Sequence, residues 1–208
     1  MIKVTIGLPS NGFIRTETTV SLVTAVANTK GIYFRLANPT GCYIHQNREL
    51  IALEALKENS THLLFVDADM GFPENAIAKL ISRNKPIIGA NYNYRNNQGK
   101  SVIQLDTTKF KDGEVNVHDN PKNKGEKLAT IKYPEEPFEC LAVATGFMLI
   151  QMEVFKKLPR PWFFFKPSSD SEGMVGEDIW FCRLARKHGI EIWCDPTIQM
   201  THVGTAFY

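Results

Sequence analysis

The chain has 208 residues, which is enough for one sizeable hydrophobic core and short for two. Its 24 Lys and Arg against 22 Asp and Glu leave a net charge of +2, so no overall field favours nucleic acid or a membrane surface. No apolar run reaches the roughly 18 residues of a membrane span, and the N-terminus alternates like a strand rather than like a secretory leader. The four cysteines form no Cys-x-x-Cys pair, which favours reduced thiols and a cytoplasmic location.

Short apolar strands alternate with helical patterns through the first 91 residues. Ile2, Val4 and Ile6, for example, alternate with polar residues. The same reasoning predicts strands at 2–8, 32–37, 63–66 and 86–91 and helices at 16–28, 45–58 and 73–84. We expect Pro73 to take the first position of the last helix. This alternation indicates an α/β protein with a mostly parallel central sheet and crossover helices.

The second half of the chain begins with a polar stretch. From Arg95 to Lys132, eight Lys or Arg accompany five Asp or Glu. We expect one or two edge strands there, in either a solvated excursion or a basic flap over an anionic partner. The core pattern returns at Leu141–Gln151, a predicted strand with Gly146 inside it, where a glycine often marks close approach by a ligand or a backbone. A short helix at 154–158, a longer one after Gly176 and a strand at 190–194 follow.

Two carboxylates, Asp67 and Asp69, follow the apolar strand Leu63–Val66. We expect this strand to be buried on both faces, because it is apolar throughout and too short for a free-standing helix. Ligands bind beyond the carboxyl ends of such strands, and adjacent carboxylates are costly to bury without a positive group. A divalent cation shared with a diphosphate would account for both charges. The simpler alternative is a polar strand end, with Asp69 starting the next helix.

Charged residues also lie at two helix starts. Arg48 follows Asn47 in the first turn of the helix at 45–58, where the helix dipole disfavours a cation, so Arg48 is expected to point at an anion. The alternative is a solvent-facing arginine paired with Glu49 or Glu54. Glu177 and Asp178 open the helix after Gly176; capping explains one acid, and the second suggests a further role.

Two further residues are candidates for a ligand site. Trp162 begins four successive aromatic residues in a Pro-rich loop, which suits a lid or a surface for stacking a sugar. Packing at the edge of the core is the alternative for the phenylalanines. His202 lies near the C-terminus, where a lone histidine is usually structural or exposed.

In their order and spacing, these motifs resemble those of GT-A-fold glycosyltransferases, close to the large family 2 group. The resemblance covers nearly the whole chain. It rests on Asp67-Ala68-Asp69 after an apolar strand, Asn47-Arg48, Thr145–Ile150, Gly176-Glu177-Asp178 and His202-Val203-Gly204. It implies one Rossmann-like GT-A domain over 1–208, with a nucleotide-sugar-binding half at 1–94, the polar excursion at 95–137 and an acceptor and catalytic half at 138–208.

The resemblance also implies roles for single residues. Mn2+ or Mg2+ would be held by Asp69 and His202, with Asp67 near the ribose and the waters of the metal. Asp178 would be the general base of an inverting reaction, and Glu177 is the alternative candidate for that role. Trp162 is expected on the acceptor side. The expected donor-binding residues are Pro9, Ser10, Asn11, Asn47, Arg48, Asp67 and Gly146.

The expected activity is transfer of a sugar from a nucleotide-sugar donor, a UDP-sugar, to an acceptor hydroxyl. The acceptor is expected to be a glycan or a hydroxylated modified base in DNA. One alternative is a metal-dependent nucleotide hydrolase or nucleotidyltransferase, which would use Asp67 and Asp69 but would not need an acid at the start of the late helix. The other is a non-catalytic module that binds sugar nucleotides.

Overall fold

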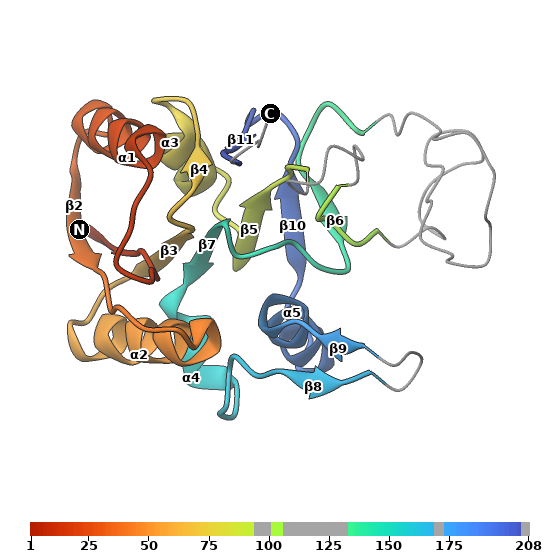
Figure 1. Cartoon of the computed structure of the whole chain (residues 1–208). Helices are drawn as coiled ribbons and strands as arrows, with labels where there is room; N and C mark the ends of the chain where they lie inside the picture. Colours follow the sequence, from red (N-terminus) through yellow and green to blue (C-terminus); the bar gives the residue numbers. More distant parts are fainter. Residues whose placement is uncertain (94–100, 106–132, 169–172, 205–208) are drawn as a thin grey trace, which may run out of the picture.

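The chain forms three layers, with helices on both faces of a central β-sheet (Figure 1). This computed structural model describes residues 1–93, 101–105, 133–168 and 173–204. The helices are α1 (Thr16–Asn28), α2 (Ile44–Lys57), α3 (Ala76–Ser82), α4 (Met152–Lys157) and α5 (Glu177–Lys187). None of these helices of the described chain is long and apolar enough to cross a membrane.

Seven strands form the central sheet. In sheet order they are β2 (Ile32–Ala37), β1 (Ile2–Gly7), β3 (His62–Val66), β7 (Phe147–Gln151), β5 (Ile87–Ala90), β10 (Ile192–Asp195) and β6 (Phe138–Cys140). Strand β7 is antiparallel to both β3 and β5, and β6 is antiparallel to β10, whereas the other neighbours are parallel. Two short antiparallel pairs join β4 (Met70–Gly71) to β11 (Thr201–His202) and β8 (Lys166–Pro167) to β9 (Met174–Val175). The mostly parallel α/β sheet confirms the predicted fold class.

Strand β3 lies between two hydrophobic clusters. Leu63 and Phe65 pack toward the face covered by α2, α4 and α5, whereas Leu64 and Val66 pack toward α1 and α3. All four side chains are fully buried. A strand covered on both faces needs an apolar residue at every position, which confirms the prediction made from its sequence.

Three predicted details are wrong. Helix α3 begins at Ala76 rather than Pro73, because Ala76 N–H donates to Pro73 O in a tight turn before the helical bonding begins. Gly146 precedes β7 rather than lying inside it. Most of the expected excursion at 95–137 lies outside the described residues, but within 101–105 the apolar Val102, Ile103 and Leu105 are buried against the core rather than solvated.

The topology brings distant segments to one edge of the sheet. Because β1, β3 and β5 run in the same direction, the loops that follow them leave at the same edge. Strand β7 runs the other way, so it starts at this edge, with Phe147 opposite Val66. Gly146 consequently lies beside Asp67, whose N–H donates to Gly146 O at 3.0 Å.

The buried strand gives a direct test of this packing. Leu64→Ala removes a fully buried side chain, so we expect it to lower the free energy of unfolding by about 2–5 kcal/mol in urea denaturation. Leu50→Ala is the matched control, because Leu50 is 55% exposed and should change stability by about 0.5 kcal/mol or less. Equal losses for the two variants would contradict the placement of β3.

Candidate active site

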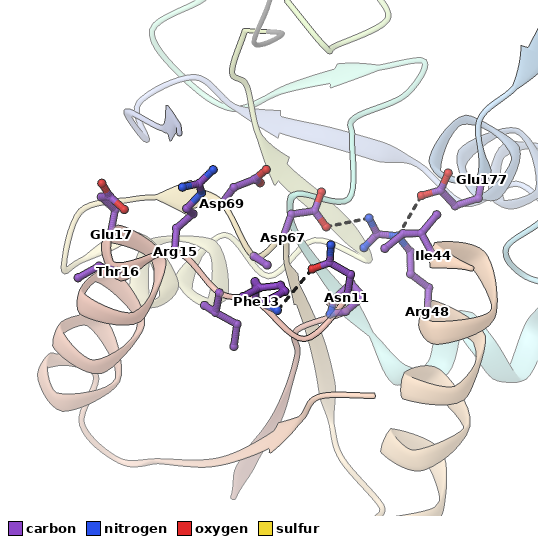
Figure 2. A pocket seen from close by; sticks show the side chains of 13 residues that line it. Asn11, Phe13, Arg15, Thr16, Glu17, Ile44, Arg48, Asp67, Asp69 and Glu177 are labelled. Carbon is purple, nitrogen blue, oxygen red and sulfur yellow. Dashed lines mark hydrogen bonds and ion pairs between the residues drawn. The ribbon is translucent and has the colours of Figure 1, made fainter. Parts of the chain in front are cut away.

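A pocket of about 950 Å³ opens at this edge of the sheet (Figure 2). Its walls come from the loop after β1, the first turn of α1, the start of α2, the segment after β3 and the start of α5. The predicted site residues that line it are Pro9, Asn11, Arg48, Asp67, Asp69 and Glu177. The fold therefore gathers most of the predicted donor side into one cavity.

The guanidinium of Arg48 joins two walls of this pocket. Its Nη2 donates to Asp67 Oδ1 at 2.8 Å and its Nε donates to Glu177 Oε1 at 3.1 Å, from opposite sides (Figure 2). The Arg48 side chain is only 3% exposed. Burial by itself would lower the pKa of Arg48, but the carboxylates of Asp67 and Glu177 raise it above its ordinary value. Arg48 is therefore a buried, charged bridge.

This geometry decides between the two predictions for Arg48. The solvent-facing alternative is wrong, because Arg48 is buried and because Glu49 and Glu54 pair with other arginines. The anions that Arg48 contacts are the carboxylates of the protein itself. Within the described residues its Nη1 is buried and has no hydrogen-bond partner.

Asp178 lies next to Glu177 but makes a different contact. Its Oδ1 accepts a hydrogen bond from the N–H of Ile179 at 2.7 Å. Burial, and next the charge of Glu177, raise the pKa of Asp178 from 3.8 to about 6, although Ile179 N–H and Arg48 oppose this shift. At neutral pH Asp178 is thus ionised but more basic than an exposed aspartate, which suits a proton acceptor.

The β4–β11 pair brings His202 to Asp69. The N–H of Val203 donates to Asp69 O at 2.8 Å, and His202 Nε2 lies 3.7 Å from Asp69 Oδ1. His202 Nδ1 lies 3.0 Å from Asn93 O, and a carbonyl oxygen can only accept, so Nδ1 carries a proton. In the neutral imidazole, Nε2 is then the nitrogen with a free lone pair, which a metal ligand needs.

Asp69 and His202 fit a divalent cation only as part of a larger set of ligands. In the described part of the chain, no group of three or more His, Cys, Asp and Glu side chains could hold a metal ion. Asp67, also predicted at the metal, is instead hydrogen-bonded to Arg48. A cation at Asp69 and His202 would therefore need further oxygen ligands from a bound molecule, as a diphosphate provides.

Tyr92 is a site residue that the sequence analysis missed. Its hydroxyl oxygen accepts from Gly146 N–H at 3.1 Å, and its ring meets the ring of His202 edge-on, with centroids 5.4 Å apart. Burial first, and then the charges of Asp67 and Asp178, raise the pKa of Tyr92 well above its ordinary value. The hydroxyl therefore stays protonated. The sequence did hold one signal for Tyr92: it follows the predicted strand at 86–91, and ligands bind at the carboxyl ends of such strands.

The predicted donor loop is only partly placed at the pocket. Pro9 and Asn11 line it, and so does Phe13, which was not predicted and is 80% exposed. Ser10 is buried, and its Oγ accepts from Gly12 N–H at 3.3 Å. Asn47 does not line the pocket and donates to Gly41 O at 3.2 Å. Ser10 and Asn47 thus support the loops around the pocket.

Trp162 does not offer a surface for a sugar. Its side chain is 4% exposed, its Nε1 donates to Leu158 O at 3.1 Å, and its ring packs against Phe155. Glu49 accepts the backbone N–H groups of Trp162 and Phe163, which fixes this loop against α2. The acceptor-side prediction for Trp162 is therefore wrong, because the indole belongs to the core.

Comparison with known proteins supports the fold but not a family. No protein-family model matches this chain, and no curated protein does. The crystal structure of A197 from STIV is similar over 99% of this chain and 87% of that one, with a TM-score of 0.61 and 14% identity. At this identity the likeness concerns the fold alone.

Two further solved structures have lower TM-scores. TarS 1–349 from S. aureus, solved in complex with UDP-GlcNAc, matches 100% of this chain and 62% of its own with a TM-score of 0.38 and 11% identity. A glycosyltransferase involved in glycosylation of the major capsid of PBCV-1 matches 76% of this chain and 69% of its own, with a TM-score of 0.29 and 15% identity. Likeness at this level carries no argument about the present chain.

The contact between Gly146 and Tyr92 can be tested by one methyl group. A Cβ on Gly146 would overlap the Tyr92 hydroxyl and lie 3.2 Å from Asp67 Oδ2. We expect Gly146→Ala to lower the free energy of unfolding by about 1–3 kcal/mol in urea denaturation. Adding Tyr92→Phe should recover part of this loss, because it removes the nearest atom. No recovery in the double variant would contradict the observed contact.

Proposed function

We propose that this protein is a GT-A-type, family 2-like glycosyltransferase that uses a divalent cation. The observation that supports this most is the presence of two acidic groups on different elements at the pocket: Asp69 lines it, and Asp178 follows Glu177, which also lines it. Asp69 lies 3.7 Å from His202 Nε2, whereas Asp178, with its raised pKa, stands beside Glu177 on another element. A transferase of this type needs both a cation site at its leaving diphosphate and a separate proton acceptor.

The donor side follows from the pocket. A nucleoside diphosphate sugar, for which a UDP-sugar is the expected candidate, would occupy the cavity walled by Asn11, Ile44 and Asp67. Asp69 and His202 would hold Mn2+ or Mg2+ together with diphosphate oxygens, and the cation would supply positive charge to the leaving group. Arg48 holds Asp67 in place through the hydrogen bond from its Nη2 to Asp67 Oδ1.

The acceptor side is assigned to Asp178. Its carboxylate would take the proton of the acceptor hydroxyl while the hydroxyl oxygen bonds to the anomeric carbon and the bond from that carbon to the diphosphate oxygen breaks. Attack opposite the leaving group inverts the anomeric centre. A base in this position contributes about 10²–10⁴ in rate. A glycan or a hydroxylated DNA base remains the expected acceptor.

One experiment separates this proposal from the two alternative classes. The protein is incubated with a panel of nucleotide sugars and Mn2+, and the free nucleotide is identified. A transferase should release the nucleoside diphosphate slowly to water. Release of the monophosphate would instead support a nucleotide hydrolase, and tight binding without any release would support a non-catalytic module.

The proposed cation ligands predict a shared phenotype. Asp69→Ala and His202→Ala should each weaken Mn2+-dependent binding of a nucleoside diphosphate, measured by calorimetry, and abolish or strongly lower turnover, because each removes one ligand. Glu74→Ala is the control, since Glu74 is an exposed carboxylate outside the pocket. Nucleotide binding by Asp69→Ala that is as tight as in the wild type would exclude this cation site.

Asp178→Asn tests the proposed base. Asn keeps the size of the side chain but cannot take a proton, so transfer should fall by about 10²–10⁴ while donor binding survives. The rate is measured with the acceptor and not with water, because water need not require the same base. Transfer near the wild-type rate would remove Asp178 from the mechanism.

The stability of the same variant has a predicted pH dependence. Because the pKa of Asp178 is raised from 3.8 to about 6, the folded protein binds this proton more tightly than the unfolded chain, and wild-type stability falls as pH rises through this window. Asn does not ionise. The Tm of Asp178→Asn should therefore exceed that of the wild type above pH 6, and the difference should shrink between pH 6 and about 4 and be lost below that.

A further inference from the structure

Glu177 and Asp178 are adjacent but held by different partners. Glu177 is 8% exposed, and its Oε1 accepts from Arg48 Nε at 3.1 Å. Asp178 Oδ1 is tied to the N–H of Ile179. A Cβ on Gly176 would lie only 2.8 Å from Asp178 Oδ1, so the glycine before this pair leaves room for the Asp178 carboxylate. The first turn of α5 thus presents two acids with distinct surroundings.

We propose that Glu177 is a positioning residue for Asp178 rather than a second base: with Arg48 it fixes the first turn of α5, and its negative charge makes the neighbouring carboxylate a better proton acceptor. This inference rests on the proposed function and deepens it. It replaces the sequence-based expectation that Glu177 and Asp178 compete for one task.

The ion pair engages Glu177 within the protein. Its Oε1 accepts from Arg48, whose buried charge is compensated by Glu177 and Asp67 together. Breaking a buried ion pair by removing one partner is strongly unfavourable. Because Glu177 is held by Arg48, it can keep the start of α5 against α2 and the end of β3.

The groups that face Asp178 come from four segments. Glu177 on the same helix and Asp67 after β3 carry negative charge and raise the pKa of Asp178, in addition to the leading effect of burial. Arg48 on α2 lowers it. Tyr92 after β5 is neutral, because its own pKa is raised. Among the charges, Glu177 has the largest effect on Asp178, so changing Glu177 should change its basicity most.

Glu177→Gln tests this role, because Gln keeps the shape and an acceptor oxygen for Arg48 but removes the charge. Loss of a neighbouring negative charge favours the ionised form of Asp178. The acid limb of the pH profile of kcat/KM should therefore move down by about one pH unit, at the low end of the effect of a close charge. Glu177→Asp keeps the charge and should leave the limb near its wild-type position. Glu191→Gln, on an exposed carboxylate beyond α5, should change nothing.

A titration that needs no turnover tests this inference separately from the proposed function. NMR of protein carrying 13C-labelled aspartate, assigned with Asp178→Asn, follows the Asp178 carboxyl directly in the wild type and in Glu177→Gln. A lower titration midpoint in Glu177→Gln supports the inference even if no nucleotide sugar is turned over, an outcome that would reject only the transferase. An unmoved midpoint overturns it. Loss of turnover at every pH with an unmoved midpoint would make Glu177 itself the base.

Discussion

The buried guanidinium of Arg48 is the interaction on which this site depends. It separates Asp67 at the end of β3 from Glu177 at the start of α5, and these acids are 110 residues apart in sequence. With Asp178 alongside, three carboxylates would otherwise face one another in a poorly solvated space, where like charges repel strongly. Because Asp67 and Glu177 both bond to Arg48, the end of β3, the start of α2 and the start of α5 are fixed relative to one another.

The sheet topology supplies the other half of the site. Parallel strands bring the loops after β1, β3 and β5 to one edge, and the reversed strand β7 adds Gly146 to them. The short β4–β11 pair brings the C-terminal segment to Asp69, so His202 approaches from a different direction than Arg48. Arg48 with Asp67 and Glu177 thus forms a charge-compensated side of the pocket, and Asp69, which lies next to His202, lines another part of it. In the proposed reaction, Asp69 and His202 would hold the cation, and Asp178 on α5 would accept the proton.

Local sequence patterns predicted the bounds of some helices and strands. The helix at Thr16–Asn28 and the strand at Ile32–Ala37 have the predicted bounds, because periodicity and turn residues decide them. Periodicity carries no direction, so the reversal of β7 and the position of Gly146 could not be predicted. Nor could the partner of Arg48, since Glu177 lies 129 residues away. Trp162 was misassigned because exposure of a loop ring depends on tertiary packing.

Anomalous diffraction can locate the proposed cation at Asp69 and His202. Crystals grown with Mn2+ and a nucleoside diphosphate would locate the metal independently of any activity. We expect a manganese peak between the Asp69 carboxylate and Nε2 of His202, in contact with diphosphate oxygens. Nucleotide bound in the pocket with no manganese at these two side chains, or with manganese elsewhere, would contradict it.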